Sequence, residues 1–470
     1  MDDLKQAFDI MAGKSLPLTR LWRYYDGDHP IAFTNNKLHE VVPNGVVFSK
    51  NYCQVVCNAT RDRLNIQTFD YTAEGEDDAI EEAMKRLWSG VLRKVATPAH
   101  ISTLVTGEGY VIAWPDSIGA VKAYYHDPRQ VVCLYDGEDP DLMTMAAKQW
   151  CANKKQYINL YYTDRIEHYE APHAAQTATA FQLIGTDANP SGVIPVFHFR
   201  LDARRETGEL TQGVLSLQDA MNKLLNDMMV SSEYSAFPQR WGIGNWANGN
   251  VGVGAGTMAL FPGSAQGDQP AAVGTFATTD PANYLTPIDN LAHSMAVLSA
   301  TPKHFLTGAS GEPSGEALQA MEAPLIAKVL GYQQVLSQTW ADLMAFCLSV
   351  EGWWFVQARD LEVIWADPHT LQPYSQAQTR KTNTEAGIPI KNQLRDEGWT
   401  DEQLEQLEED QQDQTMATTP QPSPVLMQRA NIAPKPMTQD EAAPRFEDVV
   451  ETPDMAGELA RTGAIARAVK

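Results

Sequence analysis

Residues 214–238 read VLSLQDAMNKLLNDMMVSSEYSAFP, and this stretch decides how the rest of the chain is organised. Its apolar side chains recur at spacings of three and four, which predicts one long amphipathic helix reaching Phe237. Pro238 ends this helix, because proline lacks the backbone N–H and clashes with the preceding turn. The apolar stripe consists of Val214, Leu217, Met221, Leu224, Leu225 and Met228. A helix this long with one apolar stripe needs a partner helix.

A second helix is predicted at residues 284–300, where four apolar positions share one side: Ile288, Leu291, Met295 and Leu298. Between the two helices, residues 239–281 are rich in Gly, Ala, Asn and Thr and hold too few large apolar side chains for a core. We expect strands at 257–261 and 271–276. Because the segment is so poor in core residues, we expect these strands to pair with another copy of the chain.

Downstream, the composition of residues 301–313 predicts a loop, and residues 314–350 predict a third, long helix with kink sites at Pro324 and Gly331. A strand is expected at 361–365 and a helical pair at 375–410. The last residues lose hydrophobic periodicity and gain proline, which predicts a disordered tail over 413–470.

The first 200 residues change period along their length, which predicts an α+β domain. Helices are expected at 1–25 with a pause near 13–17, at 51–64 and at 78–95. Short strands are expected to follow at 105–114, 120–132, 150–161, 165–169, 181–184 and 193–200.

The composition limits the class of protein. A length of 470 residues predicts several subdomains, since single cores stop growing near about 250 to 300 residues. The formal charge of -23 argues against tight wrapping of DNA, which requires cationic side chains to displace counterions. Five scattered cysteines do not form a disulfide framework, and Cys53 and Cys57 are expected to be buried thiols. With no signal peptide and no membrane-length apolar run, we expect a soluble intracellular product.

No motif predicts an enzyme, a cofactor or a metal. The glycines at 252, 254 and 256 lack the following helix of a dinucleotide fold, and Gly315 is followed by Glu316 where a phosphate-binding loop needs lysine. Asp26 and Asp28 with the neighbouring histidine supply too few oxygen ligands for a hard cation. Dispersed catalytic groups have no sequence signature, so an enzyme site in the α+β domain, with candidates His29, His126, Asp136 and Asp139, stays open as an alternative.

Several stretches in order along residues 4–410 resemble phage portal proteins of the family exemplified by the SPP1 portal. Each stretch is weak alone, and the ordered set is specific. The stretches are YYDGDHP at 24–30, NYC at 51–53, DRL at 62–64, GEGYV at 107–111, IPVFHF at 194–199, LQDAMNKL at 217–224 and SGEAL at 314–318.

The resemblance implies a portal fold with an α+β wing, a long-helix stem, a small Gly-rich α/β clip, a helical crown and the disordered tail. By position, residues 1–210 and 314–372 would form the wing together with the long kinked helix. The implied stem is 211–237 with 284–300, the clip 238–283, the tunnel loop 301–313 and the crown 373–412.

The function implied by the resemblance is a ring of about twelve copies at one capsid vertex, a virion component made in the host cytoplasm. Double-stranded DNA would pass through it with weak binding during packaging and ejection. The implied partners are the terminase large subunit, a head-completion or adaptor protein, and the major capsid and scaffolding proteins, with no membrane. An adaptor or minor capsid protein is the alternative within the virion.

Two groups of residues are the candidate sites under this resemblance. Those of the loop would face the DNA: Thr301, Lys303, His304, Thr307 and Ser310. Those of the clip would meet partner proteins: Arg240, Trp241 and Trp246.

Overall fold

The computed structural model describes residues 2–30, 49–73, 78–173, 175–202, 207–244, 256–262, 272–277, 279–308, 314–369, 380–396, 404, 406 and 407. The chain divides into two units, Met1–Gln372 and Pro373–Lys470. The predicted tail at 413–470 lies outside the described residues. In the parts that the structure describes, no helix is long and apolar enough to cross a membrane.

Helix α1 spans Asp2–Asp26 without interruption, so the predicted pause near residues 13–17 is wrong. Pro17 lies inside this helix. Its cost of about 3 kcal/mol is outweighed by packing, because both halves of the helix bury side chains. Leu4 and Met11 are buried in the first half, and Leu18 and Tyr24 in the second.

The helical region predicted at 78–95 continues to Thr106 in the structure. Helix α3 spans Tyr52–Arg61, followed after strand β1 by α4 at Asp78–Leu87, a π-helical turn η1 at Trp88–Leu92 and α5 at Arg93–Thr106. Val105 is therefore helical, and the strand predicted from residue 105 begins only at Glu108. Gly107, with φ of 92°, ends α5, a conformation that other residues rarely adopt.

The strands form three sheets in the α+β body, as the sequence predicted in outline. The antiparallel order β3-β2-β9 forms one sheet, β4-β5-β6-β7-β8 a five-stranded meander, and β1-β13 a pair. Their bounds are β1 Ile66–Tyr71, β2 Glu108–Pro115, β3 Val121–His126, β4 Val131–Tyr135, β5 Met143–Ala152, β6 Lys155–Tyr161, β7 Arg165–Pro172, β8 Gln182–Ala188, β9 Val196–Arg200 and β13 Leu361–Trp365.

Two predicted strands were each wrong in the same way. The stretch 120–132 divides into β3 and β4, and 150–161 divides between β5 and β6. The second division occurs at Asn153 and Lys154, whose φ values of 49° and 60° form a tight turn between the strands. Such a turn needs no glycine when asparagine occupies the left-handed region, so its signal in the sequence is weak.

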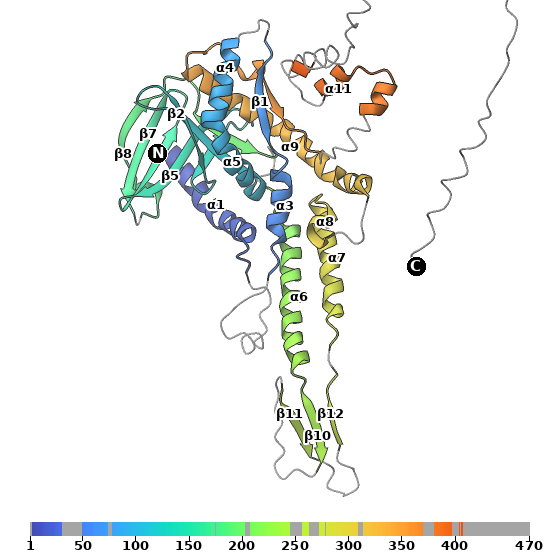
Figure 1. The fold of residues 1–470 in the computed structure, drawn as a ribbon. Coiled ribbons are helices and arrows are strands. Elements are labelled where there is room, and N and C mark those ends of the chain that lie inside the picture. Colours follow the sequence, from blue (N-terminus) through green and yellow to red (C-terminus); the bar gives the residue numbers. More distant parts are fainter. Residues whose placement is uncertain are drawn as a thin grey trace, which may run out of the picture. The chain divides into compact units, whose positions relative to one another are not determined.

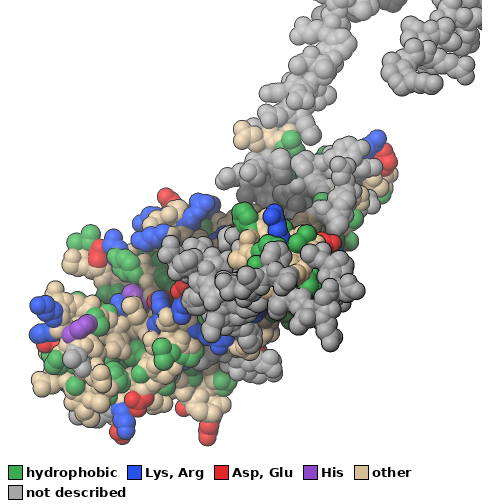
Figure 2. All heavy atoms as spheres, turned by 90° about the horizontal axis from the view of Figure 1, so that it is seen from below, with side chains coloured by type: hydrophobic (Ala, Val, Ile, Leu, Met, Phe, Trp, Pro, Cys, Tyr) green, Lys and Arg blue, Asp and Glu red, His purple; other side chains and the backbone are tan. Residues whose placement is uncertain are grey.

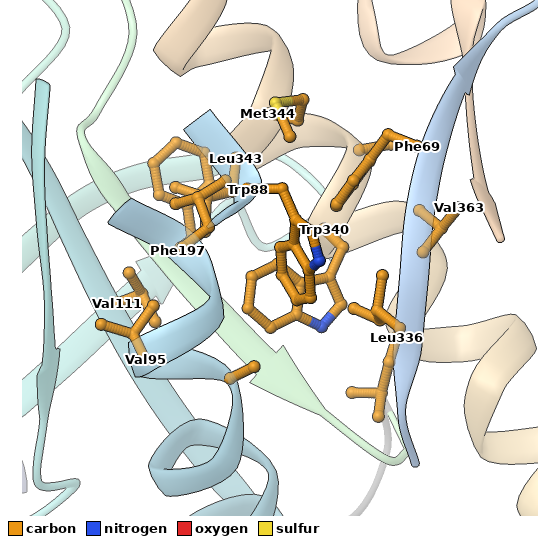
Figure 3. Packing of buried hydrophobic residues seen from close by; sticks show 14 of the residues in the cluster. Phe69, Trp88, Val95, Val111, Phe197, Leu336, Trp340, Leu343, Met344 and Val363 are labelled. Carbon is orange, nitrogen blue, oxygen red and sulfur yellow. The ribbon is translucent and has the colours of Figure 1, made fainter. Parts of the chain in front are cut away.

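The core of the body centres on Trp340 of helix α9, Gly315–Val350, which confirms the predicted long helix. The Trp340 ring is fully buried, and its indole N–H donates to His100 Nε2 at 2.9 Å. Figure 3 shows aromatic and aliphatic side chains from α9, η1, β1 and β9 around it, among them Phe69, Trp88 and Phe197. Two 3₁₀ turns, η2 at Ala178–Ala180 and η3 at Ala358–Asp360, complete the body.

Helices α6, Gln212–Ala236, and α7, Ala282–Leu298, confirm the two predicted amphipathic helices and lie side by side (Figure 1). The segment between them forms a small sheet of order β11-β10-β12. Its strands are β10 Arg240–Gly244, β11 Met258–Pro262 and β12 Ala272–Thr275. Since β10 pairs with both others in the same chain, the expectation that these strands pair with another copy is wrong for the described ladders.

After α7, residues Lys303–Thr307 form a short helix α8, where the sequence predicted a loop. In the second unit, residues 380–385 are helical, and α11 spans Ile390–Asp396. Gly387, with φ of 89°, turns the chain between these two helical segments. The remainder of the predicted helical pair at 375–410 lies mostly outside the described residues.

Candidate functional site

The α6–α7 pair is attached to the body by one apolar cluster. Side chains from α1, α3, α6, α7 and α8 pack together there, including Tyr24, Val56, Met221, Met295 and Leu306. The cluster covers only the first half of α6 and the last half of α7. Farther from the body, the pair therefore has no covering layer among the described residues.

Polar contacts fix the position of α6 against the start of α3. Gln218 is fully buried, and its Oε1 accepts from the Tyr52 backbone N–H at 3.0 Å. Its amide nitrogen donates to the Lys50 carbonyl and, at 3.0 Å, to Asn222 Oδ1. The Tyr24 hydroxyl donates to Asp219 at 2.8 Å. These directional bonds set the rotation of α6 about its axis, which apolar packing alone leaves less specified.

The turn from α7 to α8 is held by a buried ion pair. Lys328 of α9 donates to Glu209 Oε2 at 2.9 Å and to the Ser299 carbonyl at 2.7 Å. A cation at the carboxyl end of α7 also complements the helix dipole. Ala300 adopts φ of 50°, and the buried Thr301 hydroxyl accepts from Ser299 Oγ at 2.9 Å.

Helix α8 has a polar contact of its own at its first turn. Glu322 of α9 accepts from Arg63 Nη2 at 3.0 Å, and its other oxygen lies 3.7 Å from His304 Nε2. The Arg63 guanidinium stands over the Phe305 ring at 5.7 Å. Sequence reasoning missed Glu322, Arg63, Glu209 and Lys328; the available signal was two charged residues within an otherwise apolar stretch of α9.

The predicted loop residues fall into different environments. Thr301 is only 4% exposed, so its side chain does not face solvent within the chain. His304 is largely covered, whereas Lys303 is exposed. The Thr307 hydroxyl donates to the Lys303 carbonyl at 3.2 Å, and Ser310 lies outside the described residues. Lys303 is therefore the exposed cation in the described part of this segment.

The small sheet exposes much of its apolar surface. Its central strand β10 carries Arg240, which is exposed, and Trp241, whose ring lies against Gly274 of β12; Trp246 lies outside the described residues. The exposed apolar side chains around the sheet are Phe237 at 58%, Met258 at 40%, Phe261 at 40%, Val273 at 71% and Phe276 at 47%. A small sheet whose apolar side chains are this exposed gains stability when another surface packs against it.

Helices α7 and α9 also expose apolar faces. Val297 and Leu298 of α7 are 68% and 63% exposed. Between residues 317 and 338 every exposed position of α9 is uncharged, and Met321, Leu330 and Val335 are among them. By contrast, Lys and Arg side chains lie interspersed with acidic and uncharged ones on the face of the body seen in Figure 2. Such apolar faces on a charged protein mark contact surfaces.

The four candidate residues of the enzyme alternative do not come together in one site among the described residues. His29 lies against Tyr24, whereas Asp136 and Asp139 share the turn between β4 and β5. His126 lies near the Lys148 ammonium at 3.4 Å, and burial lowers its pKa to about 4. In the described ranges no group of three or more His, Cys, Asp or Glu side chains could hold a metal.

One buried ionisable network was not predicted. Glu108 accepts from Lys14 at 3.2 Å and from the Tyr110 hydroxyl at 2.7 Å, and His198 stacks on Tyr110. Burial opposes ionisation of Glu108, yet His198, Lys14 and Tyr110 hold the pKa of this carboxyl below its usual value. The network joins α1 to strands β2 and β9 within the body.

Comparison with known proteins gives a consistent result. The family model described as phage portal protein, SPP1 Gp6-like, matches residues 17–416. The portal protein of Mycobacterium phage D29 is 26% identical over 238 residues, which is 47% of this chain and 49% of that protein. The portal protein of Mycobacterium phage L5 is 28% identical over 192 residues, 38% of this chain and 39% of that protein. The chain thus spans about half the length, or less, of these curated relatives.

Solved structures with a similar arrangement come from gene transfer agent particles. A chain in the neck of an empty particle, computed with C6 symmetry, aligns with a TM-score of 0.43 and 12% identity over 75% of this chain and 89% of that one. A chain in the virion of the native particle aligns with a TM-score of 0.41 and 12% identity over 71% of this chain and 83% of that one.

Proposed function

This chain belongs to the SPP1 Gp6-like family of phage portal proteins, and we propose that it assembles into a ring of about twelve copies through which double-stranded DNA is packaged and ejected. Membership in this family makes it a structural component of the virion. The position of the ring, at one vertex of the capsid, is part of the proposal.

The proposal assigns a role to each region of the chain. The α+β body, residues 1–210 and 314–372, would be the wing, and helices α6 and α7 the stem. The small sheet within 238–283 would be the clip, residues 301–313 the tunnel loop and 373–412 the crown. The expected partners are the terminase large subunit, a head-completion or adaptor protein, and the major capsid and scaffolding proteins.

The observation that carries this proposal is the unequal burial of the two amphipathic helices. Beyond the apolar cluster that attaches them to the body, α6 and α7 leave Met229 at 37% and Leu285 at 47% exposed, and Leu298, at the end of α7 beside the cluster, is 63% exposed. Burying one such side chain contributes about 1.5 to 3 kcal/mol. Neighbouring copies around a closed ring would bury these side chains on every subunit, with no open edge left over.

The exposed face of α9 supports the same arrangement. It is uncharged over residues 317–338, so it gains from contact with an apolar surface and pays no cost for desolvating charge. The exposed Val297 and Leu298 provide an apolar surface elsewhere on the chain. Two different surfaces in contact make a heterologous interface, the type that generates rings.

The charge of the chain suits a conduit. With a formal charge of -23, the chain as a whole repels phosphates, which disfavours tight DNA binding and permits sliding. Lys303 on α8 is the exposed cation in the described part of the tunnel-loop segment, and it would make a weak contact with the passing backbone. The energy for translocation would come from the separate packaging ATPase.

Electron microscopy of the purified full-length protein tests the ring. End-on views with rotational symmetry and a central channel are the expected result, and symmetry averaging would give the subunit number. Compact monomers at high protein concentration would contradict the proposal. A ring without a channel would contradict the conduit and leave the chain as another virion component.

The DNA contact has its own test, the substitution Lys303→Glu. It should slow packaging in a reconstituted assay about fivefold, the effect of losing one exposed charge contact of about 1 kcal/mol, while rings still form. The matched control is Lys5→Glu, which reverses an exposed lysine on α1. Equal packaging rates in the two variants would place the DNA contact elsewhere.

A further inference from the structure

We propose that Glu322 is the positioning residue of α8: through His304 it holds the short helix that carries Lys303, while Arg63 fixes the carboxylate from the other side. The consequence for DNA rests on the proposed function, whereas the effect on α8 itself does not. The roles follow from how the two carboxylate oxygens are used.

The two oxygens of Glu322 serve two different elements. Oε2 accepts from Arg63 at 3.0 Å, and Oε1 faces His304 at 3.7 Å. The Glu322 side chain is only 8% exposed, so both contacts are shielded from solvent. Helix α9 thus connects the end of α3 to the start of α8 by a single side chain.

The Arg63 half of this connection is rigid. Its Nε donates to the Pro368 carbonyl at 3.1 Å and its Nη1 to the Ala59 carbonyl at 3.4 Å, in addition to the bond with Glu322. Three acceptors in different directions leave the guanidinium little freedom. Arg63 therefore fixes where the carboxylate points.

The His304 half is the weaker one. At 3.7 Å the imidazole is at ion-pair distance and beyond hydrogen-bond length. Its other ring nitrogen, Nδ1, is buried and has no hydrogen-bond partner among the described residues. Within that part of the chain, Glu322 is the polar group that faces this ring, and loss of the contact would release the first turn of α8.

The ends of the α7–α8 segment are held separately. Lys328, six positions along α9, fixes the Ser299 carbonyl before the turn, and Leu306 of α8 is 6% exposed within the apolar cluster. Release of His304 should therefore rotate α8 about Leu306 and leave α7 in place. Lys303 is adjacent to His304 in sequence, so its ammonium would move with that rotation.

Energetics favour a positioning role over a stabilising one. Removing a carboxylate and a guanidinium from water is costly, and replacing buried ion pairs with apolar residues is often neutral or stabilising. The surrounding positions of α9, Leu325, Ile326 and Val329, are buried and apolar. A positioning role, in which Glu322 selects one orientation of α8, therefore accounts for this side chain better than a stabilising role.

Hydrogen exchange on the assembled full-length protein tests the proposal. His304→Ala removes only the α8 half of the connection, and amide exchange in residues 305–308 should accelerate about tenfold, with the midpoint of global unfolding unchanged. Glu322→Gln should accelerate the same amides. His304→Lys, which places an ammonium facing the carboxylate, should return exchange to near the original rate. This rescue separates positioning from mere packing.

Two results would overturn the proposal. One is unchanged exchange of residues 305–308 in His304→Ala. The other is acceleration spread evenly over α3, α8 and α9 in Glu322→Gln, which would make the carboxylate an ordinary part of the core. If exchange in α8 accelerates in His304→Ala but the packaging rate is unchanged, the positioning role of Glu322 holds and the proposed contact between α8 and DNA is wrong.

Electron microscopy would show separately whether a variant has lost the ability to form rings.

Discussion

The α+β body and the α6–α7 region with its small sheet differ in how large a core each one has. In the body, large side chains such as Trp340, Tyr110 and Phe199 are fully buried by other parts of the same chain. In residues 212–298, Phe237, Val273 and Val297 are each more than half exposed. The body is therefore folded by its own contacts, whereas under the proposed ring the second region would gain further burial from neighbouring copies.

The contrast is sharpest at the point where the two regions meet. There α6 and α7 have both an apolar cluster and directional polar bonds, including the contacts of Gln218 and of Lys328. Toward the sheet, these contacts give way to exposed apolar side chains. Stability should therefore fall along the helix pair with distance from the body.

The largest effect is expected for Trp340→Ala in the body. It removes a fully buried ring that touches Trp88 and Phe199, at centroid distances of 5.8 and 4.9 Å, and it leaves His100 without its donor. The free energy of unfolding should fall by about 3 to 5 kcal/mol. Urea unfolding followed by far-UV circular dichroism measures it.

Trp354→Ala is the matched control, because this indole is 79% exposed. Its free energy of unfolding should change by less than about 0.5 kcal/mol. Equal losses in the two variants would mean that the body does not depend on the core around Trp340, and the contrast between the regions would fail.

A smaller effect is expected from acidification, again in the body. Burial lowers the pKa of His100 to about 4, and its Nε2 accepts from Trp340. Between pH about 6.5 and about 4 the unfolded chain binds a proton at this site that the folded chain does not, so stability falls as the pH falls through this window. The loss approaches about 3 kcal/mol below pH 4.

His100→Gln keeps an acceptor for Trp340 and removes this titration. Unfolding measured from pH 7 to pH 4 should then show a smaller slope, though not a flat line, because burial also lowers the pKa of His126 to about 4. His293→Gln, on an exposed position of α7, serves as the control. An unchanged slope in His100→Gln would show that this imidazole does not stay neutral in the folded state.

The sequence predicted the elements whose pattern is local. Helices α6 and α7 and the long helix α9 were predicted correctly, since the spacing of apolar positions is visible in a short window. Strand β10 was not predicted, and its pairing with β11 and β12 replaces the expected pairing with another copy, because the glycine-rich segment gives no register signal. The continuity of α1 through Pro17 depends on burial against distant strands, which a local pattern does not contain.

The candidate site was less predictable than the fold. Lys303 and His304 adjoin in sequence, and only the structure separates the exposed ammonium from the largely covered imidazole. Glu322 and Arg63 are 259 positions apart, so no spacing rule could have joined them. The family resemblance implied which segment would form the loop, and long-range contacts determine which side chains are free to act.

The third prediction concerns assembly rather than folding. Leu298→Asp places a charge on the exposed apolar end of α7, which should cost each subunit contact about 2 kcal/mol and shift rings toward smaller species. Unfolding of the separated subunit should not change. Sedimentation velocity measures the first effect. Ile118→Asp, at a position of the body that is 86% exposed, should leave assembly intact. Rings of full stability in Leu298→Asp would exclude this face from the interface.

The smallest effect is expected in the small sheet, from Gly274→Ala. A Cβ at this position would come within 2.6 Å of the Trp241 ring, so the ring or the strand must move. The cost of about 1 to 2 kcal/mol should stay local. Amides of β10 and β12 should exchange about tenfold faster, while global unfolding keeps its midpoint. Gly185→Ala in β8, where a Cβ meets nothing within 4 Å, is the control. If Gly274→Ala lowered global stability instead, the sheet and the body would fold as one cooperative unit, and the division between a self-sufficient body and a region completed by assembly would be wrong.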